Sequence, residues 1–271
     1  MSFGLGRGRT LDPGAIGVSE RELPPMPDGP PADGAPPESA PPDRAPPDRA
    51  PAEGAPSEGA PAGAALLRGA RIDPRAWFPN PERPFEIEVG SGKGTFLLQQ
   101  AEVSPETNYL GIEWAGEFYA YAADRIRRRG LTNVRMLRAD ATDYLRWRVP
   151  DGVARVIHLY FSDPWPKARH HKRRVVQDRF LADARRVLSS DGELRIVTDH
   201  DDYWSWMEEH FARWSPASGT GPFLRLPFER PASAGVGEVV GTNFERKYAR
   251  EGRPFHATIL RKGPGANHPN G

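Results

Sequence analysis

The sequence predicts an α/β fold in which a mostly parallel, twisted sheet carries helices on both faces. From about residue 65 onward, short apolar runs rich in β-branched and aromatic residues alternate with amphipathic stretches of helical period. Glycine or acidic residues follow several of the apolar runs, as expected where ligands bind at the carboxyl ends of parallel strands. The alternation indicates one domain of roughly 200 residues, large enough for a hydrophobic core.

The expected elements follow one another in a regular order. The strands are expected at residues 85–89, 108–112, 134–137, 154–161 and 193–197, with a last strand at 255–260. The amphipathic stretches between them predict helices at 95–101, 116–129, 175–188 and 202–214. A loop-rich stretch at 215–241 precedes the last strand. Each strand but the last is thus followed by a helix or a loop that leads to the next strand.

The first 64 residues differ from the rest in composition. Half of the 30 prolines lie there, and residues 35–64 repeat a proline- and alanine-rich pentad that begins with Ala-Pro. This tract has little apolar surface to bury, and proline lacks an amide donor, so residues 1–64 are expected to be a disordered extension. The domain is expected at 65–262 and a flexible tail at 263–271.

Charge divides at the same boundary. Residues 1–64 hold 5 Lys and Arg against 10 Asp and Glu, which leaves 32 against 26 in the remainder, although the whole chain has a formal net charge of +1. The folded part is therefore more basic than the total indicates. Two basic runs, at residues 125–129 and 167–174, are either solvated surface or contacts for an anionic partner.

Several classes of protein are disfavoured by what the chain lacks. It has no cysteine, which excludes disulfides, a thiolate nucleophile and cysteine-ligated zinc. The amino-terminal residues show no hydrophobic signal core, and no apolar run approaches the roughly 18 residues that span a bilayer. A cytoplasmic protein without membrane contact is therefore expected, and oligomeric state is not readable.

A glycine-rich turn and three acidic residues indicate a nucleotide-like cofactor. The run Glu88-Val-Gly90-Ser-Gly92-Lys-Gly follows the first expected strand and opens a helix, where glycines permit a tight turn and free amides face a ligand. Glu113 ends the second strand, where it can accept both hydroxyls of an adenosine ribose, and Asp140 follows the third. A lone glycine turn would be weak evidence, but this succession strengthens it.

The form of the turn favours S-adenosylmethionine. A phosphate-binding loop for ATP needs Gly-Lys followed by Ser or Thr, whereas Gly94 follows Lys93 here. A dinucleotide enzyme more often has a six-residue turn, and a nicotinamide oxidoreductase is a distant alternative. S-adenosylmethionine carries cationic sulfonium and ammonium groups in place of phosphates, and acidic neighbours such as Glu88 suit that charge.

The most informative segment is residues 161–174, in which Asp163 and a Pro-Trp-Pro corner precede a dense basic block. The preceding residues 156–161 are apolar enough for a buried strand, so Asp163 should lie just past its carboxyl end. A base-sized slot beside a phosphate-binding surface is the functional interpretation. A solvated charged loop after a core strand is the alternative, and His170 and His171 fit an RNA surface better than a metal site.

With these motifs in this order, the chain closely resembles the bacterial tRNA (guanine-N7)-methyltransferases over residues 71–262. The most specific motifs are Ser-Asp-Pro-Trp-Pro-Lys at 162–167 with the basic block after it, Val-Thr-Asp-His at 197–200 and Gly-Thr-Asn-Phe-Glu-Arg-Lys-Tyr at 241–248. The resemblance implies a Rossmann-like class I methyltransferase with an antiparallel carboxyl-terminal strand. It further implies S-adenosylmethionine as cofactor and methylation of N7 of guanine 46 in the tRNA variable loop.

The resemblance also implies roles for residues that match the family's motifs. The implied cofactor contacts are Glu88, Gly90, Gly92, Glu113, Asp140 and Asp163, of which Asp163 is also the proposed catalytic residue. The implied substrate contacts are Lys167, Asp199, Thr242, Asn243, Phe244 and Glu245. The implied RNA contacts are Arg169, His170, His171, Lys172, Arg173 and Arg174. No metal is expected.

The chemistry is consistent with these residue types. Guanine N7 already has an in-plane lone pair, so no proton has to leave the attacking atom, and alignment is the main task. Asp163 and Asp199 are candidates to stabilise the purine as it becomes cationic. Two alternatives stay open, namely an amino-group methyltransferase that acts on another nucleic acid or protein and a non-catalytic RNA-binding protein on the same fold.

Overall fold

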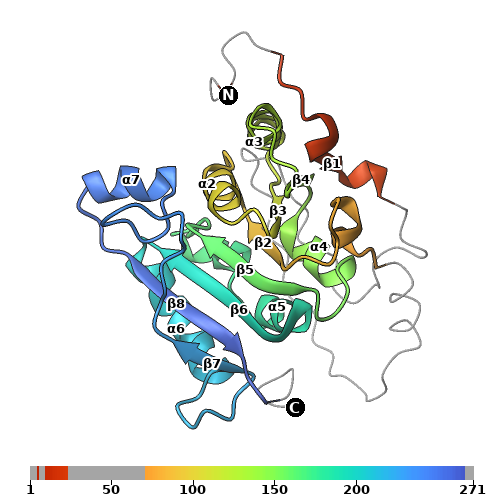
Figure 1. Ribbon diagram of the computed structural model, residues 1–271. Coiled ribbons are helices and arrows are strands. Elements are labelled where there is room, and N and C mark those ends of the chain that lie inside the picture. Colours follow the sequence, from red (N-terminus) through yellow and green to blue (C-terminus); the bar gives the residue numbers. More distant parts are fainter. Residues whose placement is uncertain (1–4, 6–9, 24–70, 266–271) are drawn as a thin grey trace.

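The computed structural model describes residue 5 and residues 10–23 and 71–265, and their eight strands form one sheet (Figure 1). The strand order is β1-β4-β3-β2-β5-β6-β8-β7. The strands are β1 (Gly17–Ser19), β2 (Phe85–Val89), β3 (Asn108–Ile112), β4 (Val134–Arg138), β5 (Ala154–Tyr160), β6 (Leu188–Thr198), β7 (Phe223–Leu226) and β8 (His256–Lys262). Neighbours from β1 to β6 are parallel, whereas β8 is antiparallel to both β6 and β7.

Helices cover both faces of the sheet (Figure 1). The α-helices are α2 (Thr95–Val103), α3 (Gly116–Arg128), α4 (Ala141–Trp147), α5 (Asp178–Val187), α6 (Asp201–Trp214) and α7 (Asn243–Arg250). The short 3-10 helices are η1 (Gly14–Ile16), η2 (Glu20–Glu22), η3 (Pro74–Trp77) and η4 (Ala168–Arg173). Apolar residues of α4, α5 and α6 pack in one buried cluster, and those of α2 and α3 pack in a second. This confirms the Rossmann-like class I methyltransferase fold with an antiparallel carboxyl-terminal strand.

The central strand β2 explains where a ligand can bind. All five of its residues are buried, and it pairs with β3 on one side and with β5 on the other. The chain runs outward from β2 through β3 to β4, then returns to β5 and continues outward through β6. The direction of winding therefore reverses between β2 and β5, and the loops after these two strands diverge there. In open α/β sheets such a switch point is where ligands bind.

The amino-terminal segment differs from the prediction that residues 1–64 form a disordered extension. Residues 10–23 fold onto the domain, and β1 adds a parallel edge strand to β4. Ile16 is buried against α3, and Arg127 of that helix donates a hydrogen bond to the Asp12 carbonyl at 2.9 Å. The pentad tract at 35–64 and most of residues 2–10 lie outside the described residues.

The other differences also have local causes. Helix α4 was not predicted; Asp140 caps it by accepting from the amides of Thr142 and Asp143. Strand β7 lies inside the stretch expected to be loop, and it pairs only with β8 at the edge. Residues 263–265 were expected in a flexible tail, yet the amide of Gly263 donates to the Pro222 carbonyl at 2.8 Å. Within 263–271, residues 266–271 lie outside the described part.

We expect Gly17→Val to detach β1 and destabilise the domain. A Cβ at this position would lie 2.4 Å from the Tyr119 hydroxyl and 2.6 Å from the Pro13 side chain, so the segment must shift. Overpacking of this kind costs about 1–3 kcal/mol, which corresponds to a fall in melting temperature of roughly 2–10 °C by calorimetry. Ala15→Val, at an exposed position of the same segment, is the control and should leave the melting temperature unchanged.

Candidate functional site

The glycine-rich turn connects β2 to α2 at the switch point. Gly90, Gly92 and Gly94 all have positive φ angles, of 73°, 53° and 64°, which other residues adopt only with strain. A Cβ at Gly94 would lie 2.9 Å from the Ala122 Cβ, so glycine there lets α3 approach the turn closely. A Cβ at Gly90 would contact nothing within 4 Å. The turn therefore faces open space beside Gly90, into which a ligand can approach the backbone.

Glu113 fixes the shape of this turn. It follows β3, and its Oε2 accepts a hydrogen bond from the Gly92 amide at 2.8 Å. Its Oε1 accepts from the Ala115 amide, also at 2.8 Å, at the start of α3. One carboxylate thus joins the β2–α2 turn to the β3–α3 loop. Because each carboxylate oxygen has a second lone pair, Glu113 can still accept from a bound hydroxyl.

Glu88 brings a second carboxylate to the same place, and it is almost completely buried. Its Oε2 and the hydroxyl of Ser91 are both buried, and neither has a hydrogen-bond partner in the described part of the chain. Burial raises the pKa of Glu88 well above its usual value, and the nearby charge of Glu113 raises it further. A polar ligand at the turn would supply the partners that this buried acceptor and this buried hydroxyl lack.

Asp163 is the third carboxylate of this group. Desolvation raises the pKa of Glu113 against the lowering effect of its two backbone hydrogen bonds, and the charge of Asp163 raises it further. Desolvation by the surrounding protein also raises the pKa of Asp163, although its side chain reaches solvent. Glu88, Glu113 and Asp163 therefore lie at the carboxyl ends of β2, β3 and β5, which are neighbours in the sheet, and the charge of each of two of them acts on another.

The corner that carries Asp163 has an unusual backbone. Phe161 and Trp165 have positive φ angles of 55° and 43°, which are rare for non-glycine residues and cost free energy. The strain is held by contacts on both sides: the Phe161 amide donates to the Val197 carbonyl at 2.8 Å, and Arg174 Nε donates to the Pro164 carbonyl at 2.8 Å. Strained backbone that is firmly supported is typical of functional sites.

Trp165 points toward the basic segment rather than into the core. Its ring lies under the Arg173 guanidinium at 5.0 Å and meets the His170 ring edge-to-face at 5.8 Å. Lys167, Arg169 and Lys172 of the same segment are exposed. The segment therefore presents both cations and an aromatic ring beside the Asp163 corner.

Helix α7 lies beside the amino-terminal end of α2 (Figure 1). Asn243 Nδ2 donates to the Thr95 hydroxyl at 2.9 Å, and a Cβ at Gly92 would lie 3.9 Å from the Phe244 ring. Phe244 is 49% exposed, which is high for a phenylalanine. The helix therefore borders the glycine turn and places an exposed aromatic ring next to it.

Asp199 follows β6, and its side chain is nearly buried. Its Oδ2 accepts a hydrogen bond from Arg253 Nη1 at 2.8 Å. The Arg253 guanidinium lies 4.2 Å from the centre of the Tyr248 ring. Burial raises the pKa of Tyr248, and the charges of Asp199 and, more weakly, Asp163 also contribute. Asp199 and Asp163 therefore both lie within electrostatic range of one aromatic ring.

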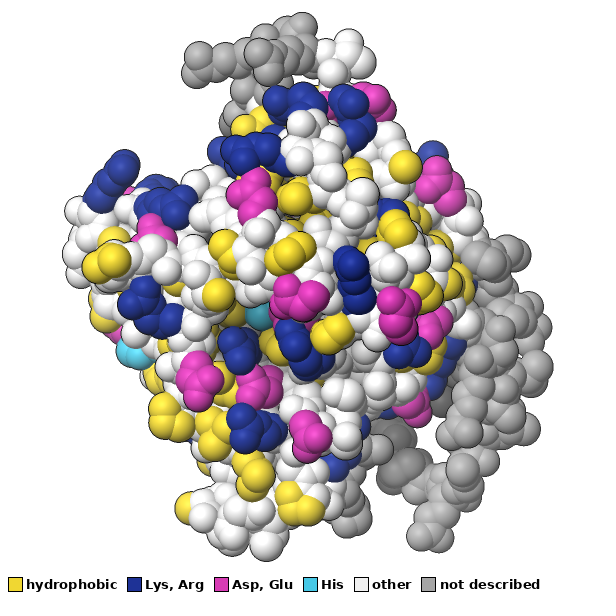
Figure 2. Space-filling model, in the orientation of Figure 1, with side chains coloured by type: hydrophobic (Ala, Val, Ile, Leu, Met, Phe, Trp, Pro, Cys, Tyr) yellow, Lys and Arg dark blue, Asp and Glu magenta, His cyan; other side chains and the backbone are white. Residues whose placement is uncertain are grey.

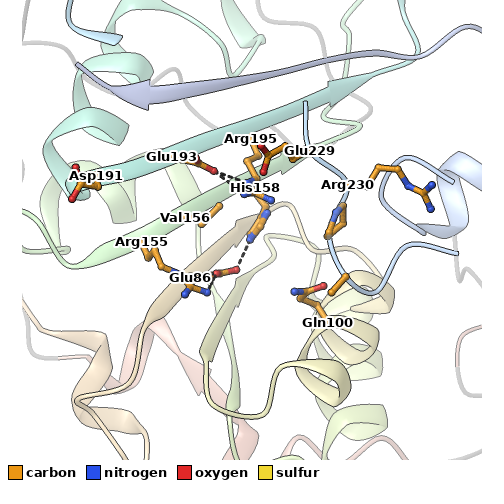
Figure 3. Close-up of a pocket in the computed structure, with 12 residues that line it drawn as sticks. Glu86, Gln100, Arg155, Val156, His158, Asp191, Glu193, Arg195, Glu229 and Arg230 are labelled. Carbon is orange, nitrogen blue, oxygen red and sulfur yellow. Dashed lines mark hydrogen bonds and ion pairs between the residues drawn. The ribbon is translucent and has the colours of Figure 1, made fainter. Parts of the chain in front are cut away.

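A separate hollow of about 380 Å³ lies on the face of β2, β5 and β6, away from their carboxyl ends (Figure 3). The charged groups in its centre are paired with one another: Glu86 accepts from His158 Nε2 at 2.8 Å, and Glu193 accepts from Arg195 at 2.7 Å. Burial lowers the pKa of His158, so this histidine is neutral and its Nδ1 accepts from the Tyr160 hydroxyl. Saturated pairs of this kind make a structural network.

Comparisons with known proteins agree with this geometry. A family described as "Putative methyltransferase" matches residues 82–220, just over half of the chain. The chain is 34% identical to a tRNA (guanine-N7)-methyltransferase of Streptococcus thermophilus over 176 residues, which cover 65% of this chain and 79% of the relative. It is 37% identical to the enzyme of that name from Rhodopirellula baltica over 198 residues, 71% of each chain.

The chain belongs to the tRNA (guanine-N7)-methyltransferase family. Among solved structures, an aminoglycoside resistance methyltransferase, NpmB1, aligns with a TM-score of 0.47 at 20% identity and covers 66% of this chain and 87% of its own. Within the described residues, no group of three or more His, Asp or Glu side chains is placed to hold a metal ion. No helix in the same residues is both long and apolar enough to cross a membrane.

The structure gives several of the predicted site residues a structural role. Arg174 was predicted to contact RNA, but it is buried between the Tyr203 and Trp206 rings and pairs with Asp202. Its guanidinium is therefore unavailable to RNA, and it supports the Asp163 corner through Pro164. His171 likewise packs against Trp206, at 5.7 Å between ring centres.

Two of the predicted substrate contacts instead hold α7 in place. Thr242 caps the helix by accepting from the Glu245 amide at 3.1 Å. The buried Glu245 carboxylate accepts from the amides of Val239, Val240 and Gly241. This arrangement corresponds to a Thr-x-x-Glu capping box whose glutamate reaches further back along the chain than usual. Neither side chain is available to a substrate, in contrast to Asn243 and Phe244, which are exposed.

Three residues of the site were missed by sequence reasoning. Ser91 lies inside the glycine turn, and its position next to Glu88 was a signal that could have been used. Tyr248 ends the Gly-Thr-Asn-Phe-Glu-Arg-Lys-Tyr motif, and the motif alone indicated no role for it. Arg253 lies in a glycine- and proline-containing turn, and nothing in its sequence environment indicates that it pairs with Asp199.

We expect Glu88→Gln to separate stability from cofactor binding. Because the pKa of Glu88 is raised in the folded state, that state binds more protons, and stability falls as pH rises from the unfolded pKa through the folded one. The variant should therefore lose less stability than the wild type as pH rises above the ordinary glutamate pKa. Its affinity for cationic S-adenosylmethionine should fall about tenfold or more, since hydrogen bonds to charged groups contribute about 1.5–3 kcal/mol.

Melting curves across this pH range, with and without S-adenosylmethionine, measure both effects. Glu229→Gln, at an exposed position beside the separate hollow, is the control and should behave as the wild type. Unchanged cofactor affinity in Glu88→Gln would remove this residue from the site.

We expect Glu245→Ala to loosen α7 and the residues before it. The change leaves buried backbone amides without an acceptor, which costs about 1–3 kcal/mol. Hydrogen exchange should accelerate at residues 239–248, while exchange in β2 and β5 changes little. Glu209→Ala, at an exposed position of α6, is the matched control. Unaltered protection at 239–248 would show that the carboxylate is not needed to hold the helix.

Proposed function

We propose that the protein transfers the methyl group of S-adenosylmethionine to N7 of guanine 46 in the variable loop of tRNA. What supports this proposal is the placement of Glu88, Glu113 and Asp163 at the carboxyl ends of three neighbouring strands, at the switch point of the sheet, in a chain of this family. Desolvation raises the pKa of all three carboxyl groups, because it disfavours their charged forms. A cationic ligand supplies the missing countercharge.

The residues that would hold the cofactor follow from their positions. Glu113, which is already oriented by two backbone amides, has lone pairs left for the ribose hydroxyls. Glu88 and Ser91 offer a buried carboxylate oxygen and a hydroxyl at the turn. Asp140 follows β4, the strand beside β3, and is proposed to contact the adenine end of the cofactor. When bound, S-adenosylmethionine supplies an activated methyl group on a cationic sulfur.

The target atom makes modest demands on the protein. Guanine N7 carries an in-plane lone pair, so the residues have to align it and need not remove a proton. The purine becomes more positive as the methyl group arrives, and a carboxylate in a partly desolvated place stabilises that charge strongly. Asp163 has such surroundings, as its raised pKa indicates. The charges of Asp199 and Asp163 both contribute to the raised pKa of Tyr248. Both can accept from N1–H and the exocyclic amine of guanine.

Cationic surfaces next to the site are suited to RNA. Lys167, Arg169, Lys172 and Arg173 lie beside the Asp163 corner. Figure 2 shows further Lys and Arg side chains over α3 near the top of the view and over α7 at its left, where the last turns of both helices are basic. Phosphate contacts of this kind weaken as salt concentration rises. Trp165 offers a ring on which a displaced base can stack.

The proposed catalytic domain spans residues 65–262 together with the amino-terminal residues 10–23 that dock onto it. We further propose that the enzyme acts in the cytoplasm, because its proposed substrate is tRNA. The contribution of the pentad tract at 35–64 can be measured by deleting it and comparing tRNA affinity.

The test of the proposal is methyl transfer from labelled S-adenosylmethionine to a tRNA transcript, followed by mass-spectrometric mapping of the modified nucleoside. A transcript with adenine in place of guanine 46 is the matched control and should remain unlabelled. Label at an exocyclic amine, or label on protein or DNA instead of tRNA, would reject the proposed chemistry. Binding of tRNA without any transfer would instead indicate a non-catalytic RNA-binding protein.

We expect Asp163→Asn to lower kcat on the order of 10²-fold, the usual cost of removing one preorganised electrostatic contact. Affinity for tRNA should change little. The rate of the wild type should rise with pH as Asp163 ionises, through a pKa that lies above the ordinary aspartate value. This limb of the pH profile should be absent from the variant. Asp191→Asn, at an exposed position away from the site, serves as the control, and full activity in Asp163→Asn would refute the assignment.

A further inference from the structure

Arg253 lies next to the site, and three contacts define its position. Its Nη1 donates to Asp199 Oδ2 at 2.8 Å, its Nη2 pairs with Glu251 at 2.7 Å, and its guanidinium lies 4.2 Å from the centre of the Tyr248 ring. Tyr248 in turn contacts Phe244 in a stacked arrangement, at 6.1 Å between ring centres. A flat cation is thus bound to a carboxylate and lies against an aromatic wall.

The same set of contacts suits a guanine base. Guanine is flat, and its Watson-Crick edge presents the N1 proton and the exocyclic amine as adjacent donors. A guanidinium presents adjacent N–H donors in the same planar manner, and a carboxylate accepts from both groups. An aromatic ring receives either group on its face. The Asp199 carboxylate and the Tyr248 ring therefore match guanine as well as they match Arg253.

The exposure of the Asp199 and Arg253 side chains favours displacement of Arg253 by a base over a purely structural role for this ion pair. The Asp199 side chain is only 11% exposed, whereas the Arg253 side chain is 43% exposed. The carboxylate is thus fixed in the protein, while the cation comes from a solvent-facing turn. Asp163 follows β5 and Asp199 follows β6, and these two strands pair in parallel, so both carboxylates lie at the same edge of the sheet. A base that replaced Arg253 at Asp199 would lie at the edge that carries the proposed catalytic carboxylate.

We propose that Arg253 is a displaceable stand-in for the substrate guanine, whose guanidinium holds Asp199 and covers Tyr248 until the target base replaces it. This inference rests on the proposed function. The stand-in keeps Asp199 paired in the free protein, where a nearly buried carboxylate without a partner would be costly. It also selects among bases, because an incoming base must offer Asp199 hydrogen-bond donors as good as those of the guanidinium that it displaces. Adenine has an acceptor at N1 and fails to do so.

The test compares the binding of two tRNA transcripts, one with guanine 46 and one with adenine at that position. Arg253→Ala removes the competitor of guanine but also removes a cation that attracts RNA, and the second effect acts equally on both transcripts. The ratio of the two Kd values therefore isolates the first effect. We expect the variant to increase the preference for the guanine transcript about fivefold, which is about 1 kcal/mol at 1.4 kcal/mol per tenfold.

Two matched variants complete the experiment. Arg250→Ala removes an exposed cation near the end of α7 and should weaken both transcripts equally, with an unchanged ratio. Arg253→Lys keeps the charge but not the flat pair of donors, so its ratio should lie between those of the wild type and Arg253→Ala. Melting temperatures establish that the variants are folded.

The outcomes separate this inference from the proposed function. If the wild type methylates the guanine transcript but Arg253→Ala leaves the Kd ratio unchanged, Arg253 is only a phosphate-contacting or structural cation, and the inference fails. A lower preference for guanine in Arg253→Ala would also overturn it, since Arg253 would then position Asp199 for the base. If the wild type transfers no methyl group to N7, the proposed function itself fails, whatever the ratio.

Discussion

The carboxylate of Glu113 is the contact on which the arrangement of the site depends. It joins the Gly92 amide, in the turn after β2, to the Ala115 amide, in the loop after β3, and so ties together two loops that begin on neighbouring strands. The glycine turn has three positive φ angles, and this anchor holds the amide of its central glycine, Gly92. The position of the turn relative to the neighbouring loop follows from this carboxylate together with the hydrogen bonds from the Gly90 and Ser91 amides to the Ile112 carbonyl.

The site concentrates charge of one sign, which is unusual in a protein interior. Burial raises the pKa of Glu88, and a neighbouring carboxylate adds to the shift. By contrast, the buried carboxylate of Glu86 is paired with the Arg155 guanidinium and accepts from His158. The contrast separates a structural charge network from a ligand site. It also explains why the hollow of Figure 3 is not where the chemistry is expected.

The strands were largely predictable from sequence, because each is a short apolar run with turn residues at its ends. The bounds of β2 and β3 agree with the prediction, and the glycine turn, Glu113 and Asp163 fall where the order of elements placed them. Side-chain partners were less predictable. Arg174 and Glu245 lie in charged motifs that read as solvent-facing, yet tertiary contacts bury both. The strand β1 was missed because its three residues gain stability only from pairing with β4.

The docking of β1 has a consequence for the connectivity of the molecule. Residues 10–23 and residues 71–265 belong to the same folded body, so the stretch of chain between Leu23 and Arg71 is covalently attached to that body at both ends. A single cut between these points would convert the amino-terminal strand from a tethered element into a separate peptide. Its retention would then depend on concentration rather than on the covalent chain, as for any ligand whose linker has been severed.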